Sequence, residues 1–516
     1  MLQFEVYHDG KPAEKIDLTG AYAFGQDAIP IRADLKADKG LISCTKRIPG
    51  PAGLALLWDA GATGTFVLST TRLPERKKPY NLCLELARAQ VFRIIQKRED
   101  WGLFDYDDAK ELNEEFEAVK NMYVQALQAA KPADASRLGR EALSQGITLG
   151  EKMALFHADI FLRHRKAAAQ AAGRTTFGAA VNLNADNEAY RARLHEAADF
   201  FSIPMAWQTL EPKEQEHQYA KIDAWVNFAG RAKKPVHAGP LLGFDSGNLP
   251  DWLYIWEHDY ETLRDLIYEH IQRVVGRYGK QVQVWNVVSG IHANNSFNLT
   301  FEQLMELTRM SCLLVKKLAP HSRVMIELVM PWGEYYARNQ RTIPPLMYAD
   351  MAVQSGIKFD AFGVQLLMGV PRDGYFVRDL MQTSSLLDEF VSFGKAVHVS
   401  ACQVPSGISK DVNDAWEGEA EIMRAGKWHA PWSPRLQAEW LQAFYRIGIS
   451  KPFVQSICWR NLADYDRHCI PHGGLCHANM KPKLAFRELR NFKAFLQAKA
   501  PGGTPKPAKT DGEQKS

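Results

Sequence analysis

The sequence predicts an α/β protein in which a (β/α)₈ TIM barrel follows an N-terminal β-sandwich and a helical connector. Three observations support this prediction. Residues 1–78 alternate short apolar runs with turn residues, and residues 79–173 carry apolar side chains at helical spacing. Residues 174–498 repeat an apolar run, usually followed by a helical stretch, eight times. Residues 499–516 are rich in Pro, Gly and Lys, as is typical of a disordered tail.

The first region contains short segments with the composition of strands. Turn signals such as His8-Asp9-Gly10 and Asp38-Lys39-Gly40 separate them. Short strands at such regular spacing favour a small β-sandwich. The predicted strands are Leu2–Tyr7, Ala21–Phe24, Ile31–Leu35, Leu41–Thr45, Gly53–Trp58 and Thr65–Ser69.

The second region has the periodicity of amphipathic helices. Leu82, Leu86, Val91 and Ile94 recur mostly at steps of three or four residues, the spacing that places side chains on one helix face. The length of the region accommodates two or three long helices. We expect its charged residues to form a solvent-exposed face.

The third region has the size and rhythm of a barrel. Eight β/α units within about 325 residues are typical of this fold. A doubly wound sheet is the alternative, but the region has no Gly-rich phosphate loop, and the barrel is therefore favoured. The predicted strands are Phe177–Leu183, Ile203–Trp207, Val236–Leu242, Val282–Val288, Val324–Val329, Ala361–Leu366, Val397–Cys402 and Val454–Trp459.

Composition and charge exclude several classes of protein. There are 63 Lys and Arg against 59 Asp and Glu, a net charge of +4 that does not indicate a nucleic-acid partner. No apolar run approaches the roughly 18 residues of a membrane span, so we expect no membrane association. Seven scattered cysteines and an N-terminus without a secretory signal favour a cytoplasmic location. Nothing in the composition indicates a protein partner.

Tryptophans gather where a barrel would have its functional site. In this fold the site lies at the C-terminal ends of the strands and in the loops that follow. Flat aromatic faces there suit the apolar faces of sugar rings, although each tryptophan could instead pack a loop against the rim. The tryptophans in predicted loops or at strand ends are Trp207, Trp252, Trp256, Trp332, Trp416, Trp428, Trp432 and Trp459.

Several motifs in this region occur in the order seen in a known family. They are Met205-Ala206-Trp207 with Glu211-Pro212, Leu249-Pro250-Asp251-Trp252, Arg277-Tyr278 with Trp285-Asn286-Val287-Val288-Ser289-Gly290, Asp360-Ala361-Phe362-Gly363-Val364-Gln365, Gln437-Ala438, Trp459 and Lys481-Pro482-Lys483-Leu484-Ala485. Together they resemble family 10 glycoside hydrolases, the endo-β-1,4-xylanase type. The resemblance covers the barrel region and not the first 173 residues. It implies a barrel that acts on or binds a polysaccharide.

The departures from the family pattern concern its chemistry. Retaining glycosidases need two carboxylates about 5–5.5 Å apart. The resemblance implies that the acid/base glutamate position is Gly290 and that the nucleophile position is Ala401. Neither residue can transfer a proton or attack a sugar. The sequence therefore predicts no catalytic residue at the family's positions.

Other acidic residues are candidates to replace the missing pair. Glu327, at the end of the fifth predicted strand, is the best placed of them, and Glu211, Asp245, Glu334 and Asp464 also lie near the predicted mouth. A carboxyl group in a dry site can serve as a general acid. The alternative is that each is a hydrogen-bonded or exposed structural acid.

No motif indicates a cofactor. Walker, Rossmann, His-Glu-x-x-His and Gly-x-Ser-x-Gly patterns are absent from the sequence. Cys469, His472, Cys476 and His477 could in principle complete a zinc site, but their spacing matches none of the usual zinc patterns. We therefore expect neither a cofactor nor a metal.

Three functional hypotheses follow. The favoured one is a non-catalytic, xylanase-like barrel, a pseudoenzyme of polysaccharide metabolism that binds a carbohydrate. The second is an active, divergent glycoside hydrolase that uses other carboxylates such as Glu327, and the third is an interaction scaffold without a sugar ligand. The predicted substrate-binding residues are Trp207, Glu211, Trp252, Asn286, Trp332, Gln365, Trp416, Trp428, Trp432 and Trp459.

Overall fold

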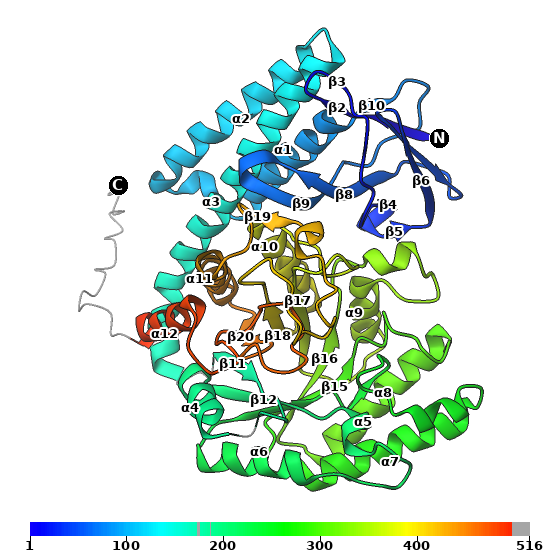
Figure 1. The fold of residues 1–516 in the computed structure, drawn as a ribbon, viewed down its shortest axis with the longest axis vertical. Coiled ribbons are helices and arrows are strands. Elements are labelled where there is room, and N and C mark those ends of the chain that lie inside the picture. The colour runs from blue at the N-terminus through cyan, green and yellow to red at the C-terminus, as the bar shows by residue number, and fades with distance from the viewer. Residues whose placement is uncertain (173–175, 186, 498–516) are drawn as a thin grey trace, which may run out of the picture.

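The structure, a computed structural model, describes residues 1–172, 176–185 and 187–497 (Figure 1). It has an upper part of small sheets and helices, and a lower part in which helices surround a ring of strands (Figure 1). Among the described helices, none is long and apolar enough to cross a membrane. The predicted disordered tail lies outside the described residues.

Eight parallel strands close into a barrel. They pair in the order β13-β12-β11-β20-β18-β17-β16-β15, and β13 also pairs with β15, which completes the ring. The predicted TIM barrel is thereby confirmed. The strands are β11 (Phe177–Ala180), β12 (Phe200–Pro204), β13 (Val236–Gly239), β15 (Val284–Ser289), β16 (Arg323–Leu328), β17 (Ala361–Leu367), β18 (Ala396–Gln403) and β20 (Val454–Trp459), with the short β14 (Leu242–Gly243) beside β15.

Helices cover the outside of this ring (Figure 1). Local sequence signals set several of their ends: for example, Thr300 and Gln303 form a reciprocal capping box at the start of α8. Buried aromatic residues such as Trp440 and Phe444 of α11 face the strands. The helices are α4 (Glu188–Ala197), α5 (Trp207–Leu210), α6 (Ala220–Arg231), α7 (Tyr260–Tyr278), α8 (Phe301–Leu318), α9 (Pro345–Gln354), α10 (Leu380–Glu389), α11 (Pro434–Ser450) and α12 (Leu484–Gln497).

The N-terminal region forms two small sheets, antiparallel except where β1 meets β10. Their orders are β10-β1-β7-β6 and β19-β9-β8-β4-β5. Each of the six predicted runs overlaps at least one of these strands. The strands are β1 (Leu2–Glu5), β4 (Tyr22–Phe24), β5 (Pro30–Ile31), β6 (Ala33–Asp38), β7 (Leu41–Lys46), β8 (Gly53–Asp59), β9 (Gly64–Ser69) and β10 (Tyr80–Asn81), with a separate hairpin of β2 (Tyr7–His8) and β3 (Lys11–Pro12).

Three helices link the small sheets to the barrel, as the periodicity predicted. They are α1 (Leu82–Asp100), α2 (Lys110–Gln128) and the 41-residue α3 (Pro132–Ala172). Helix α3 packs against α1 and α2 at one end and against the barrel helices α11 and α12 at the other (Figure 1). The barrel is thus attached to the N-terminal region along a long helix.

The barrel and the N-terminal region also share a sheet. The strand β19 (Lys427–Trp428), from the loop after β18, pairs with β9, so that Trp428 lies opposite Gly64. We call this contact zone the seam. A buried ion pair between Arg378 and Glu334 lies within it at 2.5 Å, and Arg378 also donates to the carbonyl oxygen of Val67 at 3.2 Å.

Candidate functional site

A cavity of about 490 Å³ lies inside the barrel, and we call it the axial pocket. Side chains from seven of the eight barrel strands line it, together with loops that follow them. Barrel interiors are usually filled by layers of bulky branched residues. Here small residues such as Ser202, Gly239 and Ser400 occupy inward-facing positions and leave the centre open. The volume is in the range of small-molecule sites.

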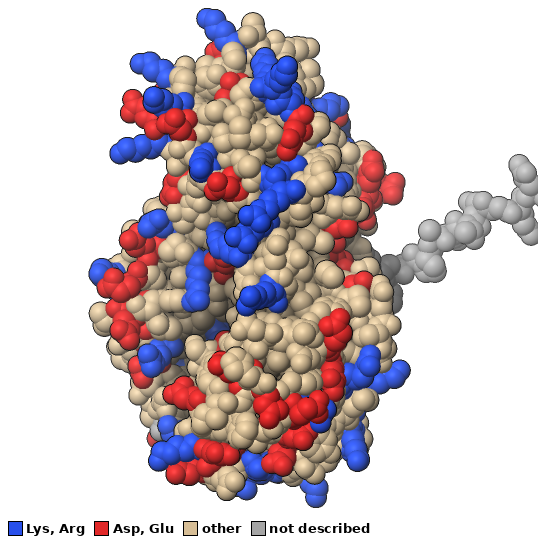
Figure 2. Space-filling model, turned by 90° about the vertical axis from the view of Figure 1, so that its right-hand side faces the viewer, with Lys and Arg blue, Asp and Glu red and all other residues tan. Residues whose placement is uncertain are grey.

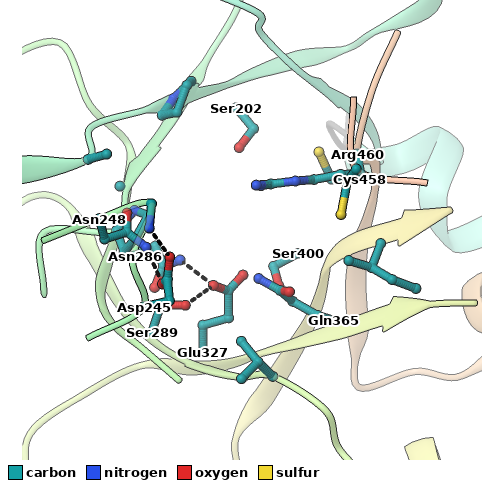
Figure 3. Close-up of a pocket in the computed structure, with 18 of the residues that line it drawn as sticks. Ser202, Asp245, Asn248, Asn286, Ser289, Glu327, Gln365, Ser400, Cys458 and Arg460 are labelled. Carbon is teal, nitrogen blue, oxygen red and sulfur yellow. Dashed lines mark hydrogen bonds between the residues drawn. The ribbon is translucent and has the colours of Figure 1, made fainter. Parts of the chain in front are cut away.

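The Glu327 carboxylate is held at one wall of the axial pocket (Figure 3). It is 4% exposed, and its Oε2 accepts hydrogen bonds from Asn286 Nδ2 at 2.9 Å and from Ser289 Oγ at 2.5 Å. The register pairs Ser289 of β15 with Glu327 of β16, which brings the hydroxyl to the carboxylate. Both predicted residues, Glu327 and Asn286, therefore line the pocket, and Ser289 joins them.

A second carboxylate, that of Asp245, lines the same pocket. Its Oδ1 accepts from the backbone N–H of Gly247 at 3.0 Å, and its Oδ2 accepts from the Asn248 amide. These contacts lie within one loop, so Asp245 also organises the backbone after β14. Gln365, predicted from the family pattern, completes this part of the lining.

Arg460 extends from the end of β20 into the open centre of the pocket, between Ser202 and Glu327 (Figure 3). Among the described residues, no carboxylate oxygen lies within 4.0 Å of its guanidinium. Burial opposes the positive charge, but the neighbouring Cys469 and Glu327 outweigh it and raise the pKa of Arg460. Arg460 was not among the predicted site residues. The signal that points to it in the sequence is its position directly after Trp459, at the end of a predicted strand.

The floor of the pocket carries uncharged histidines. Burial lowers the pKa of His398 to about 4, and burial together with His398 lowers the pKa of His237 further. His398 Nδ1 lies 2.7 Å from Ser456 Oγ, whereas its Nε2 has no partner. The side-chain oxygen Oδ1 of Asn286 and the Ser400 hydroxyl likewise have no partner among the described residues. The pocket therefore offers several unused hydrogen-bonding groups.

Gly290 and Ala401, the two positions at which the resemblance implies glutamates in the family, have distinct surroundings. Gly290 has a φ of 62°, and a Cβ built there would lie 2.7 Å from Val329 Cγ2. Its backbone N–H donates to the carbonyl oxygen of Glu327 at 3.1 Å. Ala401 is 1% exposed and belongs to an apolar cluster with Leu367 and Ile470. Neither site leaves ready space for a carboxylate.

Most of the predicted tryptophans lie outside the pocket. Trp207 and Trp252 share a partner: the Trp207 indole N–H donates to Glu211 Oε2, and that of Trp252 donates to the Glu211 carbonyl oxygen, each at 3.0 Å. Glu211 Oε2 also lies 3.4 Å from Arg273 Nη1. The predicted residue Glu211 thus organises a loop beside the barrel.

The remaining tryptophans pack in other places. Trp332 lies under the Arg378 guanidinium at 4.8 Å, and Trp416 donates to the Cys469 carbonyl oxygen at 3.0 Å. Trp428 and Trp432 are 5% and 3% exposed, and Trp459 donates to the Gly473 carbonyl oxygen at 2.9 Å. None of these indoles is among the pocket-lining residues. Their proposed role in binding sugar stays a prediction, and their positions favour packing.

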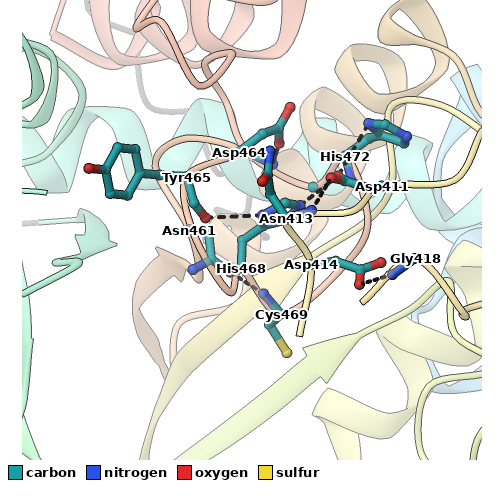
Figure 4. A network of polar contacts seen from close by, with 12 residues as sticks. Asp411, Asn413, Asp414, Gly418, Asn461, Asp464, Tyr465, His468, Cys469 and His472 are labelled. Carbon is teal, nitrogen blue, oxygen red and sulfur yellow. Dashed lines mark hydrogen bonds and ion pairs between the residues drawn. The ribbon is translucent and has the colours of Figure 1, made fainter. Parts of the chain in front are cut away.

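The loops after β18 and β20 meet in a polar network beside the pocket (Figure 4). His468 Nε2 lies 2.7 Å from Asp411 Oδ2, and the His472 backbone N–H donates to the same oxygen at 2.8 Å. Burial acts against both charges, but their pairing prevails: the pKa of His468 is raised, and that of Asp411 is lowered.

The cysteines and histidines of this region do not gather into one cluster. Cys469 lines the pocket, and His472 belongs to the polar network. Cys476 is buried, and its backbone bridges Ala463 and Pro482. Within the described part of the chain, no three His, Cys, Asp or Glu side chains are arranged to hold a metal ion.

Comparison with known proteins identifies relatives of the barrel. Residues 165–404 match the family model described as glycosyl hydrolase family 10. Endo-1,4-beta-xylanase 2 of Aureobasidium pullulans is 30% identical over 121 residues, which are 23% of this chain and 33% of that protein. Endo-1,4-beta-xylanase 3 of Hypocrea jecorina is 33% identical over 87 residues, 17% of this chain and 24% of that protein. The matches therefore span about a third or less of these two curated relatives.

Solved structures of xylanases also match. Native xylanase 10B of Thermotoga maritima is 16% identical, with a TM-score of 0.46, and the match covers 62% of this chain and 95% of that chain. Xylanase 10B of Thermotoga petrophila, solved with xylobiose, is 18% identical with the same TM-score and the same coverage of both chains.

Proposed function

We propose, from the homology of this barrel to the family 10 endo-1,4-β-xylanases, that the chain binds a saccharide in its axial pocket without hydrolysing it. The homology makes this a xylanase-like protein of carbohydrate metabolism. The proposal adds two statements: that catalysis has been lost and that binding has been kept.

The observation that supports the loss of catalysis is the environment of Gly290 and Ala401. A retaining mechanism needs a carboxyl group at each of the two positions. The left-handed backbone at Gly290 disfavours any side chain, and Val329 occupies the space in which one would begin. Ala401 is covered by apolar side chains, an environment in which an ionised nucleophile would be costly. The surroundings have therefore adapted to small residues.

The observation that supports binding is the polar lining that persists. Glu327, Gln365, Arg460 and Asn286 present donors and acceptors to one cavity. Saccharides carry hydroxyl groups that both donate and accept, so a cavity with unused groups of both kinds suits them. The xylobiose complex of the Thermotoga petrophila enzyme gives a first ligand to try.

A divergent hydrolase is the second candidate, because two carboxylates, Glu327 and Asp245, line the same pocket. In such an enzyme one of them would have to protonate the leaving group. Glu327 Oε2 already accepts hydrogen bonds from Asn286 and Ser289, and both Asp245 oxygens accept from their own loop, so the two carboxylates serve as fixed acceptors. The non-catalytic proposal is therefore preferred.

The test combines binding and turnover in the purified full chain. We expect calorimetry to detect binding of short saccharides, xylobiose among them, and we expect aryl-xylobioside hydrolysis at background. Glu327→Gln should weaken binding about tenfold, because a charged hydrogen-bond acceptor is lost. Glu302→Gln, the same change at an exposed position on α8, is the matched control.

Two results would overturn the proposal. Turnover that Glu327→Gln abolishes and Glu302→Gln leaves intact would establish the divergent hydrolase. No heat with any saccharide of a broad panel would favour the scaffold hypothesis.

A further inference from the structure

The charged groups that line the axial pocket differ in the partners that the protein gives them. The carboxylates of Glu327 and Asp245 both accept hydrogen bonds. Asn286 and Ser289 donate to Glu327, and the Asn248 amide and the Gly247 backbone N–H donate to Asp245. Arg460, in contrast, has no carboxylate within ion-pair distance among the described residues. Arg460 is itself exposed to the open cavity, so its guanidinium is accessible to a ligand that enters. Arg460 is therefore positioned to pair with an anionic ligand.

The surroundings of Arg460 indicate that a ligand supplies the anion. The guanidinium points into open space rather than along a wall (Figure 3). Among the described residues, two neutral groups beside the cavity, Asn286 Oδ1 and Ser400 Oγ, lack hydrogen-bond partners, and Asn286 is 9% exposed. The Arg460 guanidinium has one neutral neighbour, the Cys469 side chain, to which it is hydrogen-bonded. A second arginine, Arg372, lines the pocket from the loop after β17 and lies over the Trp416 ring at 5.3 Å. The outer surface has basic side chains as well, and Figure 2 shows Lys and Arg gathered across the middle of one face, beside a hollow.

We infer that the ligand is an acidic sugar, a saccharide that carries a single carboxylate, with this carboxylate on Arg460. The inference rests on the proposed saccharide-binding function and names its substrate class. The planar fork of an arginine matches a carboxylate in two parallel hydrogen bonds. The hydroxyl groups of the sugar would then meet Asn286, Ser400 and Glu327.

A carboxylate suits the pocket better than a phosphate. Glu327 and Asp245 contribute negative charges to the same cavity. A phosphate monoester carries nearly two negative charges at neutral pH and would be repelled more strongly by these groups than a singly charged carboxylate. The expected class is therefore a uronic acid or an oligosaccharide that contains one.

The experiment measures binding of matched small probes to the full chain by calorimetry. D-Glucuronate is compared with D-glucuronamide, which has the same shape and no charge, and with xylobiose and glucose 6-phosphate. We expect glucuronate to bind at least tenfold more tightly than glucuronamide, with a preference that weakens as salt is added.

Variants then assign the preference to one residue. Arg460→Gln should reduce the glucuronate preference to near unity, and Arg460→Lys should keep part of it because the charge remains. Arg467→Gln is the matched control, since Arg467 lies on the same loop, is 72% exposed and does not line the pocket. The wild-type comparison of glucuronate with glucuronamide gives the answer even if a variant fails to fold.

Each outcome distinguishes the two proposals. Binding of xylobiose without any preference for glucuronate overturns the acidic-sugar inference and leaves the proposed function standing. Tight binding of glucose 6-phosphate without glucuronate binding overturns the carboxylate assignment. Absence of binding by every saccharide overturns the proposed function itself. A preference for glucuronate that persists in Arg460→Gln would show that Arg460 does not bind the carboxylate.

Discussion

The seam and the axial pocket each contain an arginine, and the surroundings of the two differ: Arg378 is 4% exposed, whereas Arg460 is exposed to an open cavity. At the seam, Arg378 meets Glu334, Val67 and Gln382 from three different segments. In the pocket, Arg460 meets no carboxylate among the described residues. A buried and paired charge fixes how segments pack, whereas an exposed arginine without a carboxylate partner is available to a ligand. Arg378 therefore joins segments of the fold, whereas Arg460 is the residue on which the acidic-sugar proposal depends.

The largest expected effect comes from breaking the ion pair of the seam. Arg378→Ala leaves the Glu334 carboxylate buried without its partner and should lower the free energy of unfolding by about 3–5 kcal/mol. Denaturant unfolding measures this loss. Arg424→Ala, at an exposed pair with Glu421, should change it by less than about 0.5 kcal/mol. Equal losses in both variants would show that the ion pair of the seam stabilises the fold no more than an exposed ion pair does.

An intermediate effect is expected from changing Trp428, whose indole lies in the seam. The Trp428 N–H donates to Glu151 Oε1 at 2.8 Å, so Trp428→Phe should destabilise the protein by about 1–3 kcal/mol and leave saccharide affinity unchanged. Thermal unfolding and calorimetry measure the two quantities. Trp256→Phe is the control, because Trp256 is partly exposed in the segment Asp251–Trp256. Weaker saccharide binding by Trp428→Phe at unchanged stability would restore the rim-binding role predicted for Trp428.

The smallest effect concerns pH and the network between the loops after β18 and β20. The folded pKa of His468 lies above its usual value of 6.5, so its pairing with Asp411 stabilises the fold below that pH and is lost as the pH rises through the folded pKa. Because the pKa of Asp411 is lowered from 3.8, the contribution of this carboxylate to stability is lost only when the pH falls far below that value. Nearby Asp464 also favours the charged His468.

The measurement is the Tm of the wild type and of Asp411→Asn between about pH 5 and about pH 9. The wild type should lose stability toward the alkaline end, and the variant should lose less, since it has no charge to pair with His468. His8→Gln, at a side chain 64% exposed, is the control and should leave the pH profile unchanged. A wild-type Tm that rises across this range would contradict the assignment.

The barrel could be predicted because its signal is local and repeated. Ala361–Leu366 was predicted and β17 spans Ala361–Leu367; Val454–Trp459 was predicted and observed. The second strand was placed too late: β12 begins at Phe200, because Phe200 and Phe201 are buried as well and Trp207 already starts α5. Apolar runs thus located the strands to within a few residues.

The candidate site could be predicted only in part, because its contacts join distant segments. Asn286 and Gln365 were found through the family motifs. The contact of Trp428 could not be predicted, because its indole partner, Glu151, lies 277 residues away in the sequence and no local pattern reports such a contact. Arg460 was missed because its role depends on what is absent around it, which only the arrangement in space reveals.

The pairing of β19 with β9 has a consequence for anyone who wishes to work with a shorter protein. A chain cut down to residues 174–498 would match the boundaries of a barrel, yet it would remove the neighbour of β19 and the Glu151 acceptor of Trp428. An exposed strand edge next to uncovered aromatic rings is a template for self-association. The truncated protein should therefore aggregate on expression, whereas the intact chain supplies its own cover.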